Sequence, residues 1–147
     1  MPKITRDLNV LARCSVYFRG RSFEKIGISA NQYSYILSVI NNPGITQDGL
    51  SKLLFVNKSN AARQLKELEQ NGFIIRKQGQ DKRVMYVYPT EKAEEIKPEI
   101  LRVLREWNSL ITEGMTEEEL ALLEKMLDRI TDRAKDYVQG KERQCTP

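Results

Sequence analysis

The sequence predicts a mainly α-helical protein with a small β-hairpin, arranged as a winged helix-turn-helix between N- and C-terminal helices. Two short stretches with helical signals are separated by a turn of only three residues, which is typical of a helix-turn-helix. Two β-rich runs follow directly and flank a polar loop, as in a hairpin. Longer stretches with helical periodicity lie on both sides of this middle part.

Two helices are expected ahead of the helix-turn-helix. The first covers about Thr5 to Phe18, and its expected stripe consists of Leu8, Leu11, Ala12, Ser15 and Phe18. The second begins at Ser29, because Ser29-Ala30-Asn31-Gln32 has the composition of a capping box. It ends at Asn42-Pro43-Gly44, because proline lacks the amide donor and glycine turns freely.

The helix-turn-helix follows at once. Thr46 is expected to cap a short helix over Gln47 to Leu54, and the turn Phe55-Val56-Asn57 leads into a second helix that ends at Asn71-Gly72. Winding this second helix at about 100° per residue separates two faces. The face expected to dock on the rest of the domain carries Ala61, Ala62, Leu65 and Leu68. The opposite face carries Ser59, Asn60, Arg63, Lys66, Glu67 and Gln70.

The hairpin is expected from Phe73–Lys77 and Val84–Tyr88, which flank a polar tip over residues 78–83. Pro89 ends the second strand, and Thr90 can cap the helix that follows.

Two helices are expected in the C-terminal third. The first runs from about Glu91 to Thr112, and Gly114 interrupts the pattern. A capping box at residues 116–119 begins the last helix, which extends to about Tyr137, and the residues from Gly140 onward are expected to fray. The apolar side chains of the two helices are Ile100, Leu101, Val103, Leu104, Trp107, Leu110 and Ile111, then Leu120, Leu123, Met126, Leu127, Ile130, Ala134 and Tyr137.

These apolar faces need a surface to cover them. A winged domain of about 60 residues is too small to cover both helices and the stripe of the first helix, so pairing with a second copy under two-fold symmetry is the economical solution. The alternative is a helical cap on a monomer.

The charge is distributed unevenly along the chain. Residues 1–45 and 46–90 each carry a net charge of +4, whereas residues 91–147 carry −4. A basic first part followed by an acidic last part indicates a polyanion-binding region and a separate structural region. Ordinary surface charge is the alternative interpretation.

The sequence argues against an enzyme. It contains no histidine, which excludes catalysis by Ser-His-Asp or Cys-His groups and every zinc site with a histidine ligand. It has no phosphate-binding glycine loop and no cluster that suggests a metal or a cofactor. We expect a cytoplasmic protein with no membrane partner, because no signal peptide or long apolar run is present and Cys14 and Cys145 are far apart.

The polar face of the helix over residues 57–71 suits double-stranded DNA, because an α-helix fits the major groove with its N-terminal side chains at the base edges. Asparagine can pair with adenine, arginine with guanine and serine with either, so Ser59, Asn60 and Arg63 are the expected base-reading residues. Asn57 and Lys58 lie at the positive helix N-terminus, where phosphate is favoured. The further candidates are Gln64 on the flank and Lys66.

The hairpin tip is expected to contact DNA as well. Lys82 and Arg83 lie in this protruding loop, and an arginine suits the negative potential of a narrow minor groove. Asp81 would hold the Arg83 guanidinium in a fixed orientation. A charged turn with an incidental surface pair is the alternative. A protein–protein module would require an apolar exposed helix face, and RNA binding would require an aromatic platform; neither is seen in the sequence.

Several segments between Gln32 and Ile96 match a known family. They are Leu50-Ser51-Lys52-Leu53-Leu54, Asn57-Lys58-Ser59, Arg63-Gln64-Leu65, Leu68-Glu69, Asn71-Gly72-Phe73-Ile74, Asp81-Lys82-Arg83 and Pro89-Thr90-Glu91. The sequence thereby resembles the MarR (multiple-antibiotic-resistance regulator) family of bacterial transcriptional regulators. The resemblance implies a homodimer with interlocked terminal helices and with two wings flanking two recognition helices. Such a dimer is expected to bind a pseudo-palindromic operator as a repressor, and an activator is the alternative. Residues 29–90 would then form the DNA-binding domain, and residues 1–28 and 91–147 the dimerisation region.

The resemblance also implies release from DNA by small phenolic or aromatic anions, bound between the dimer helices and the winged domain. The candidate ligand contacts are Arg13, Tyr17, Tyr33 and Tyr35, each of which could instead be a packing or surface residue. Cys14 is interpreted as a small buried residue of the first helix. The alternative is a peroxide-sensing thiol, as in one branch of the family. Cys145 is expected to be an incidental exposed thiol.

Overall fold

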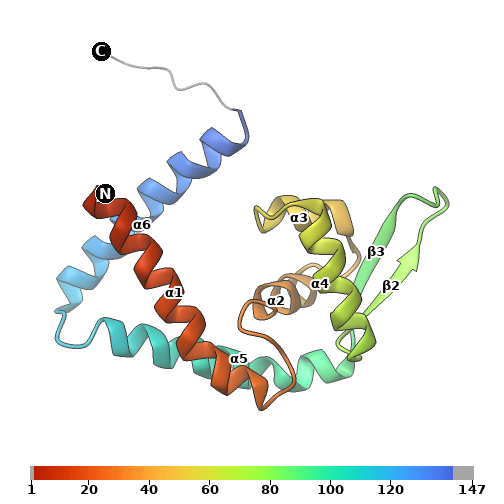
Figure 1. Ribbon diagram of the computed structural model, residues 1–147, viewed down its shortest axis with the longest axis horizontal. Coiled ribbons are helices and arrows are strands. Elements are labelled where there is room, and N and C mark those ends of the chain that lie inside the picture. The colour runs from red at the N-terminus through yellow and green to blue at the C-terminus, as the bar shows by residue number, and fades with distance from the viewer. Residues whose placement is uncertain (1, 141–147) are drawn as a thin grey trace. The chain divides into compact units, whose positions relative to one another are not determined.

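The computed structural model describes residues 2–140, and the chain divides into two compact units, residues 1–107 and 108–147 (Figure 1). The first unit contains α1 (Lys3–Glu24), α2 (Tyr33–Asn41), β1 (Ile45–Thr46), α3 (Gln47–Leu53), α4 (Lys58–Gln70), β2 (Ile74–Gln78), β3 (Met85–Pro89) and most of α5 (Glu91–Ile111). The second contains the end of α5, and α6 (Glu117–Val138). The predicted fold class is confirmed. Cys145 and most of the predicted C-terminal tail lie outside the described residues.

The sheet has three antiparallel strands in the order β1-β3-β2, whereas the sequence predicted only the two strands of the hairpin. Ile45 pairs with Val87, and Val87 pairs on its other side with Arg76. The strand that was not predicted, β1, is two residues long and is too short to show the alternation of apolar and polar residues by which strands are recognised in a sequence. The β2–β3 hairpin projects from the first unit as the wing (Figure 1).

Strand β2 begins one residue later than predicted, because Phe73 completes the end of α4. Its amide donates to Leu68 O at 2.9 Å, and the amide of Gly72 donates to Glu69 O at 3.1 Å. Gly72 has a φ of 79°, so this pair of bonds forms a Schellman turn. Pro89 is the last residue of β3, as expected for a residue without an amide donor.

Helix α1 is longer than predicted at both ends. The expected helix stopped at Phe18, but Arg19 and Phe23 follow it on the same helix, and both are buried. Their packing outweighs the cost of about 1 kcal/mol for a glycine such as Gly20 inside a helix. The helix finally ends near Gly27, whose φ of 82° favours glycine.

Helix α2 begins at Tyr33 and not at the predicted Ser29. One bond of the capping box is present, since Ser29 N donates to Gln32 Oε1 at 2.9 Å. The side-chain nitrogen of Gln32, Nε2, donates hydrogen bonds to Gln64 and Glu67 of α4. Residues 30–32 therefore form a turn in front of the helix.

One hydrophobic core holds the first unit together. Its fully buried larger side chains are Phe23, Ile36, Val39, Leu50, Leu65, Leu68, Phe73, Ile74, Val87, Ile100 and Val103. The predicted inner face of α4 is confirmed for Ala61, Leu65 and Leu68, which are completely buried. Ala62 is only half-buried. The first half of α5 contributes Ala93, Ile100 and Val103 to this core.

The second unit shows the predicted capping box. Thr116 Oγ1 accepts from Glu119 N at 3.2 Å, and Glu119 Oε2 accepts from Thr116 N at 2.9 Å. The helix that follows has no buried residue over its 22 positions. Within residues 2–140, no helix is long and apolar enough to cross a membrane.

Candidate nucleic-acid interface

The N-terminus of α4 is fixed by a tight turn and a side-chain cap. Phe55 has a φ of 55°, which turns the backbone sharply between α3 and α4. Asn57 Oδ1 then accepts from Asn60 N at 2.7 Å and caps the helix. Since the oxygen of Asn57 serves the cap, its amide nitrogen is the group left to donate to a phosphate. Lys58 and Ser59 are exposed beside it.

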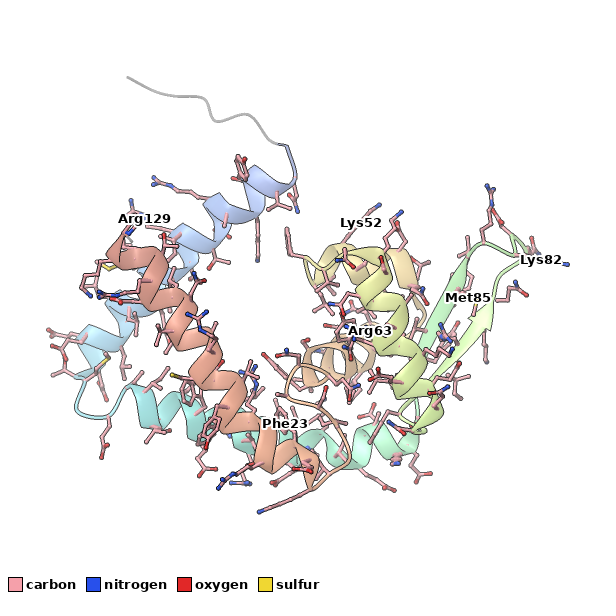
Figure 2. The ribbon with its side chains drawn as sticks, in the orientation of Figure 1. Phe23, Lys52, Arg63, Lys82, Met85 and Arg129 are labelled. Carbon is pink, nitrogen blue, oxygen red and sulfur yellow. The ribbon has the colours of Figure 1, made fainter. Side chains whose placement is uncertain are left out.

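The predicted base-reading residues lie together on the outer side of α4. Arg63 Nη2 donates to Asn60 Oδ1 at 2.9 Å, so these two side chains form one polar group. Arg63, which is labelled on α4 in Figure 2, is exposed, and so are Ser59 and Lys66 of the same helix. Within the described part of the chain, no hydrogen-bond partner is found for the side chains of Ser59 and Lys66, which are therefore free to bind a ligand.

Gln64 has a different environment from its neighbours on α4. It is half-buried, and its Oε1 accepts from Gln32 Nε2 at 3.1 Å. Gln32 Nε2 also donates to Glu67 Oε2 at 3.1 Å. The oxygen of Gln64 therefore connects α4 to the turn before α2. Periodicity placed Gln64 on the flank of α4 but could not reveal its partner.

The wing tip is ordered by its own hydrogen bonds. Arg83 Nε and Nη2 donate to the two oxygens of Asp81 at 3.1 and 3.0 Å, and Arg83 N donates to Oδ1 at 3.0 Å. These bonds lower the pKa of Asp81 and raise the pKa of Arg83. The Arg83 side chain remains 89% exposed, so its orientation is restricted while it stays open to solvent. Lys82 lies at the tip of the hairpin (Figure 2).

The wing and the N-terminus of α4 border one hollow of about 550 Å³. Lys58 lines one side and Arg83 another, together with the carboxylates of Asp48 and Asp81. Asp48 of α3 accepts from both Lys58 Nζ and Lys52 Nζ at 3.0 Å. Both lysines lower the pKa of Asp48, and Lys58 has the larger effect. Asp48 was not predicted from the sequence, because nothing in the spacing of residues 48 and 58 shows that two different helices bring them together.

The base of the wing is attached to α4 and α3. Arg76 of β2 donates through Nη2 to Glu69 Oε1 at 3.0 Å and through its backbone amide to Glu69 Oε2 at 3.0 Å. Arg76 Nη1 also donates to Gln47 Oε1 at 3.3 Å. The Arg76 side chain lowers the pKa of Glu69. Glu69 was part of a motif in the sequence, but its link to Arg76 was not predicted.

The four candidate ligand residues do not share one hollow in the described part of the chain. Arg13 and Tyr17 line a hollow of about 630 Å³ together with Phe18 and Trp107. Tyr33 and Tyr35 line another of about 320 Å³, beside Asn60 and Arg63.

These tyrosines have different surroundings. Tyr33 packs against Phe23 and under Arg19. Tyr35 is buried, and burial raises its pKa. The expectation that Cys14 is buried is wrong for the single chain, since Cys14 is exposed and lines the first hollow. The stripe of α1 reaches the core only from Phe18 onward, so a residue one turn earlier stays in solvent.

A helix-turn-helix with an ordered wing, and exposed cations on both, defines a winged-helix DNA-binding protein. Comparisons with known proteins specify the class. Residues 28–85 match the MarR family model. The HTH-type transcriptional regulator YybA of Bacillus subtilis is 29% identical over 143 residues, which are 95% of each chain.

Solved structures agree with this assignment. A crystal structure of MarR is 33% identical, with a TM-score of 0.82 over 90% of this chain and 98% of that chain. A MarR family transcriptional regulator from Listeria monocytogenes in complex with 26mer DNA is 30% identical, with a TM-score of 0.84 over 98% and 99%. The chain belongs to the MarR family. It is a DNA-binding transcriptional regulator and not an enzyme.

The Glu69–Arg76 pair leads to a prediction about acid stability. Because the folded protein lowers the pKa of Glu69, the pair stabilises the fold above the ordinary glutamate pKa of 4.5, and this contribution is lost as the pH falls through the lowered value. Glu69→Gln should therefore be less stable than wild type at neutral pH, and the difference should shrink below pH 4.5. Urea unfolding at a series of pH values measures it.

The matched control is Glu95→Gln on α5, an exposed glutamate for which no partner is found among residues 2–140. It removes one carboxylate without breaking an ion pair that is seen in the described residues, so it controls for the change in net charge. Parallel stability curves for wild type and Glu69→Gln would contradict the role of the pair.

Proposed function

We propose that the protein is a homodimeric repressor that binds a pseudo-palindromic operator, with one α4 and one wing at each half-site. The observation that carries this proposal is the polar group at the start of α4, formed by the exposed Ser59 and Arg63 with the half-buried Asn60, next to a wing whose Arg83 is held by Asp81. Base edges in the major groove are read by such side chains, and the narrow minor groove attracts arginine.

The remaining candidates divide into two roles. Lys58, Lys66 and Lys82 would neutralise phosphates, and the amide nitrogen of Asn57 would donate to one. Lys58 would have to exchange Asp48 for a phosphate, which is feasible because the lysine side chain is 81% exposed and such pairs are weak. Asp48 then keeps Lys52 as a partner. Gln64 is the exception, since its oxygen is already bound to Gln32.

The dimer is supported by apolar side chains that the single chain leaves exposed. On α1 they are Ile4, Leu8, Val10, Leu11, Val16 and Tyr17. On α6 they are Leu122, Met126, Leu127, Ile130, Tyr137 and Val138. A helix with this many exposed apolar side chains is unusual in a monomer, and two-fold pairing would bury them in a self-complementary contact. We assign dimerisation to residues 1–28 and 91–147, and DNA binding to residues 29–90.

Repression and release require no further domain. A dimer held on a promoter by two helices and two wings would block polymerase by occupying the DNA. The hollow beside α1 offers the cation Arg13 and the rings of Tyr17, Phe18 and Trp107 to a small phenolic anion. Occupation of this hollow by such a ligand is the route we propose for release in the bacterial cytoplasm.

The division between reading and positioning leads to a first prediction for binding. Arg63→Ala should cost about 1–3 kcal/mol in operator binding and relax the preference at one base pair in each half-site. Lys66→Ala should weaken binding to all sequences alike and reduce the dependence on salt, because it removes a phosphate contact. Selection of bound sequences from random DNA, followed by titration at several salt concentrations, measures both effects. An unchanged base preference in Arg63→Ala would show that Arg63 does not read a base.

The Asp81–Arg83 pair leads to a second prediction. Asp81→Ala should weaken operator binding several-fold, although it removes a negative charge, because the free Arg83 side chain loses more rotamer freedom on entering the groove. Thermal stability should hardly change, since both groups are exposed in the free protein. Glu95→Ala removes the same charge from α5, outside the wing, and should leave binding equal or slightly tighter. Tighter binding by Asp81→Ala would reduce Asp81 to an ordinary surface charge.

A further inference from the structure

Helix α1 and helix α4 are joined by polar contacts through the turn before α2. On the α1 side, Arg19 is only 7% exposed. Its Nε donates to Ala30 O at 3.0 Å, and its Nη2 donates to Asn31 Oδ1 at 3.2 Å. The guanidinium also lies 4.9 Å from the centre of the Tyr33 ring. Arg19 therefore fixes the turn to α1.

On the other side, Gln32 fixes the same turn to α4. Gln32 is 3% exposed, and its Nε2 donates to Gln64 Oε1 and Glu67 Oε2, each at 3.1 Å. Its Oε1 accepts from Ser29 N at 2.9 Å. Both hydrogens of the amide are thus used, and its oxygen is held in place by the backbone. A flipped or rotated amide would leave buried polar groups without partners, which is costly.

These bonds supply what the apolar contacts of α4 lack. Leu65 and Leu68 attach α4 to the core, but hydrophobic burial is non-directional and tolerates small shifts of a helix. Two hydrogen bonds from one buried amide to neighbouring turns of α4 are directional. They restrict both the rotation of α4 about its axis and its displacement along that axis.

We infer that Gln32 is a positioning residue for operator binding, which together with Arg19 fixes the recognition helix α4 relative to α1. This inference rests on the two-half-site binding proposed above. The exposed apolar side chains of α1 belong to the proposed dimer contact, so a fixed geometry between α1 and α4 sets the distance between the two recognition helices of a dimer. Gln32 thereby contributes to the choice of half-site spacing without contacting a base.

The test uses Gln32→Met, which keeps the length of the side chain and removes both donors. Affinity is measured for the operator selected by the wild type, for the same operator with one base pair inserted between the half-sites, and for a single half-site. Half-sites of such a dimer lie about 10 base pairs apart. We expect the wild type to bind the altered spacing roughly tenfold or more weakly than the selected operator, because the two helices cannot both reach their half-sites.

For Gln32→Met we expect half-site affinity within about twofold of wild type, because the reading side chains are unchanged. Affinity for the selected operator should fall roughly fivefold, and the penalty for the altered spacing should drop to about threefold or less, because α4 is no longer held in one position. The control is Gln70→Met, the same substitution at the exposed end of α4, which should behave as wild type.

Substitutions at the acceptor provide a second test on the surface of the protein, where the fold is not at risk. Glu67→Gln keeps an acceptor for Gln32 and should retain the spacing preference, whereas Glu67→Met removes it and should relax the preference. Full spacing preference in both Gln32→Met and Glu67→Met would overturn the positioning role of Gln32. A wild type with no spacing preference would instead overturn the two-half-site proposal, and the inference with it.

Discussion

The DNA-binding surface depends on the way one amphipathic helix, α4, divides its two faces. Ala61, Leu65 and Leu68 bury one side of α4 completely, and this burial fixes which side chains of α4 remain outside. The outer side then presents hydrogen-bonding groups at its N-terminal turns, where the helix end also favours negative charge. A substitution among these buried side chains would shift α4 and displace the outer side chains that are proposed to contact DNA.

Directional polar contacts refine what the core establishes. Glu69 ties the base of the wing to α4 through Arg76, and Asp81 restricts Arg83 at the tip of the wing. Gln32 ties α4 to the turn that Arg19 holds on α1. The contacts of Glu69 and Gln32 join separate elements, whereas the Asp81–Arg83 pair orders the wing tip itself. The winged domain therefore presents its helix and its wing as one preformed surface, which lowers the entropy lost on binding.

Much of this surface could be predicted from the sequence, because helical periodicity, caps and turns are local signals. The inner face of α4, the capping box at Thr116 and the wing followed from such signals and are present in the structure. Strand β1 was missed because two residues carry no periodicity, and α2 starts late because Gln32 is bound to α4. The exposure of Cys14 could not be foreseen either, since it depends on where the core ends along α1. The late start of α2 and the pairing of β1 with β3 depend on contacts between residues distant in the chain, to which local patterns are blind.

The central claim is that two copies of this chain act together on one operator, each with its own α4 and wing. The most direct measurement is the stoichiometry of the complex with a duplex selected from random DNA, determined by sedimentation equilibrium at micromolar concentration. We expect two chains for each duplex, a dimer in the absence of DNA, and a selected sequence with half-sites about 10 base pairs apart. A stable monomer with and without DNA, bound as one chain to each duplex, would contradict it.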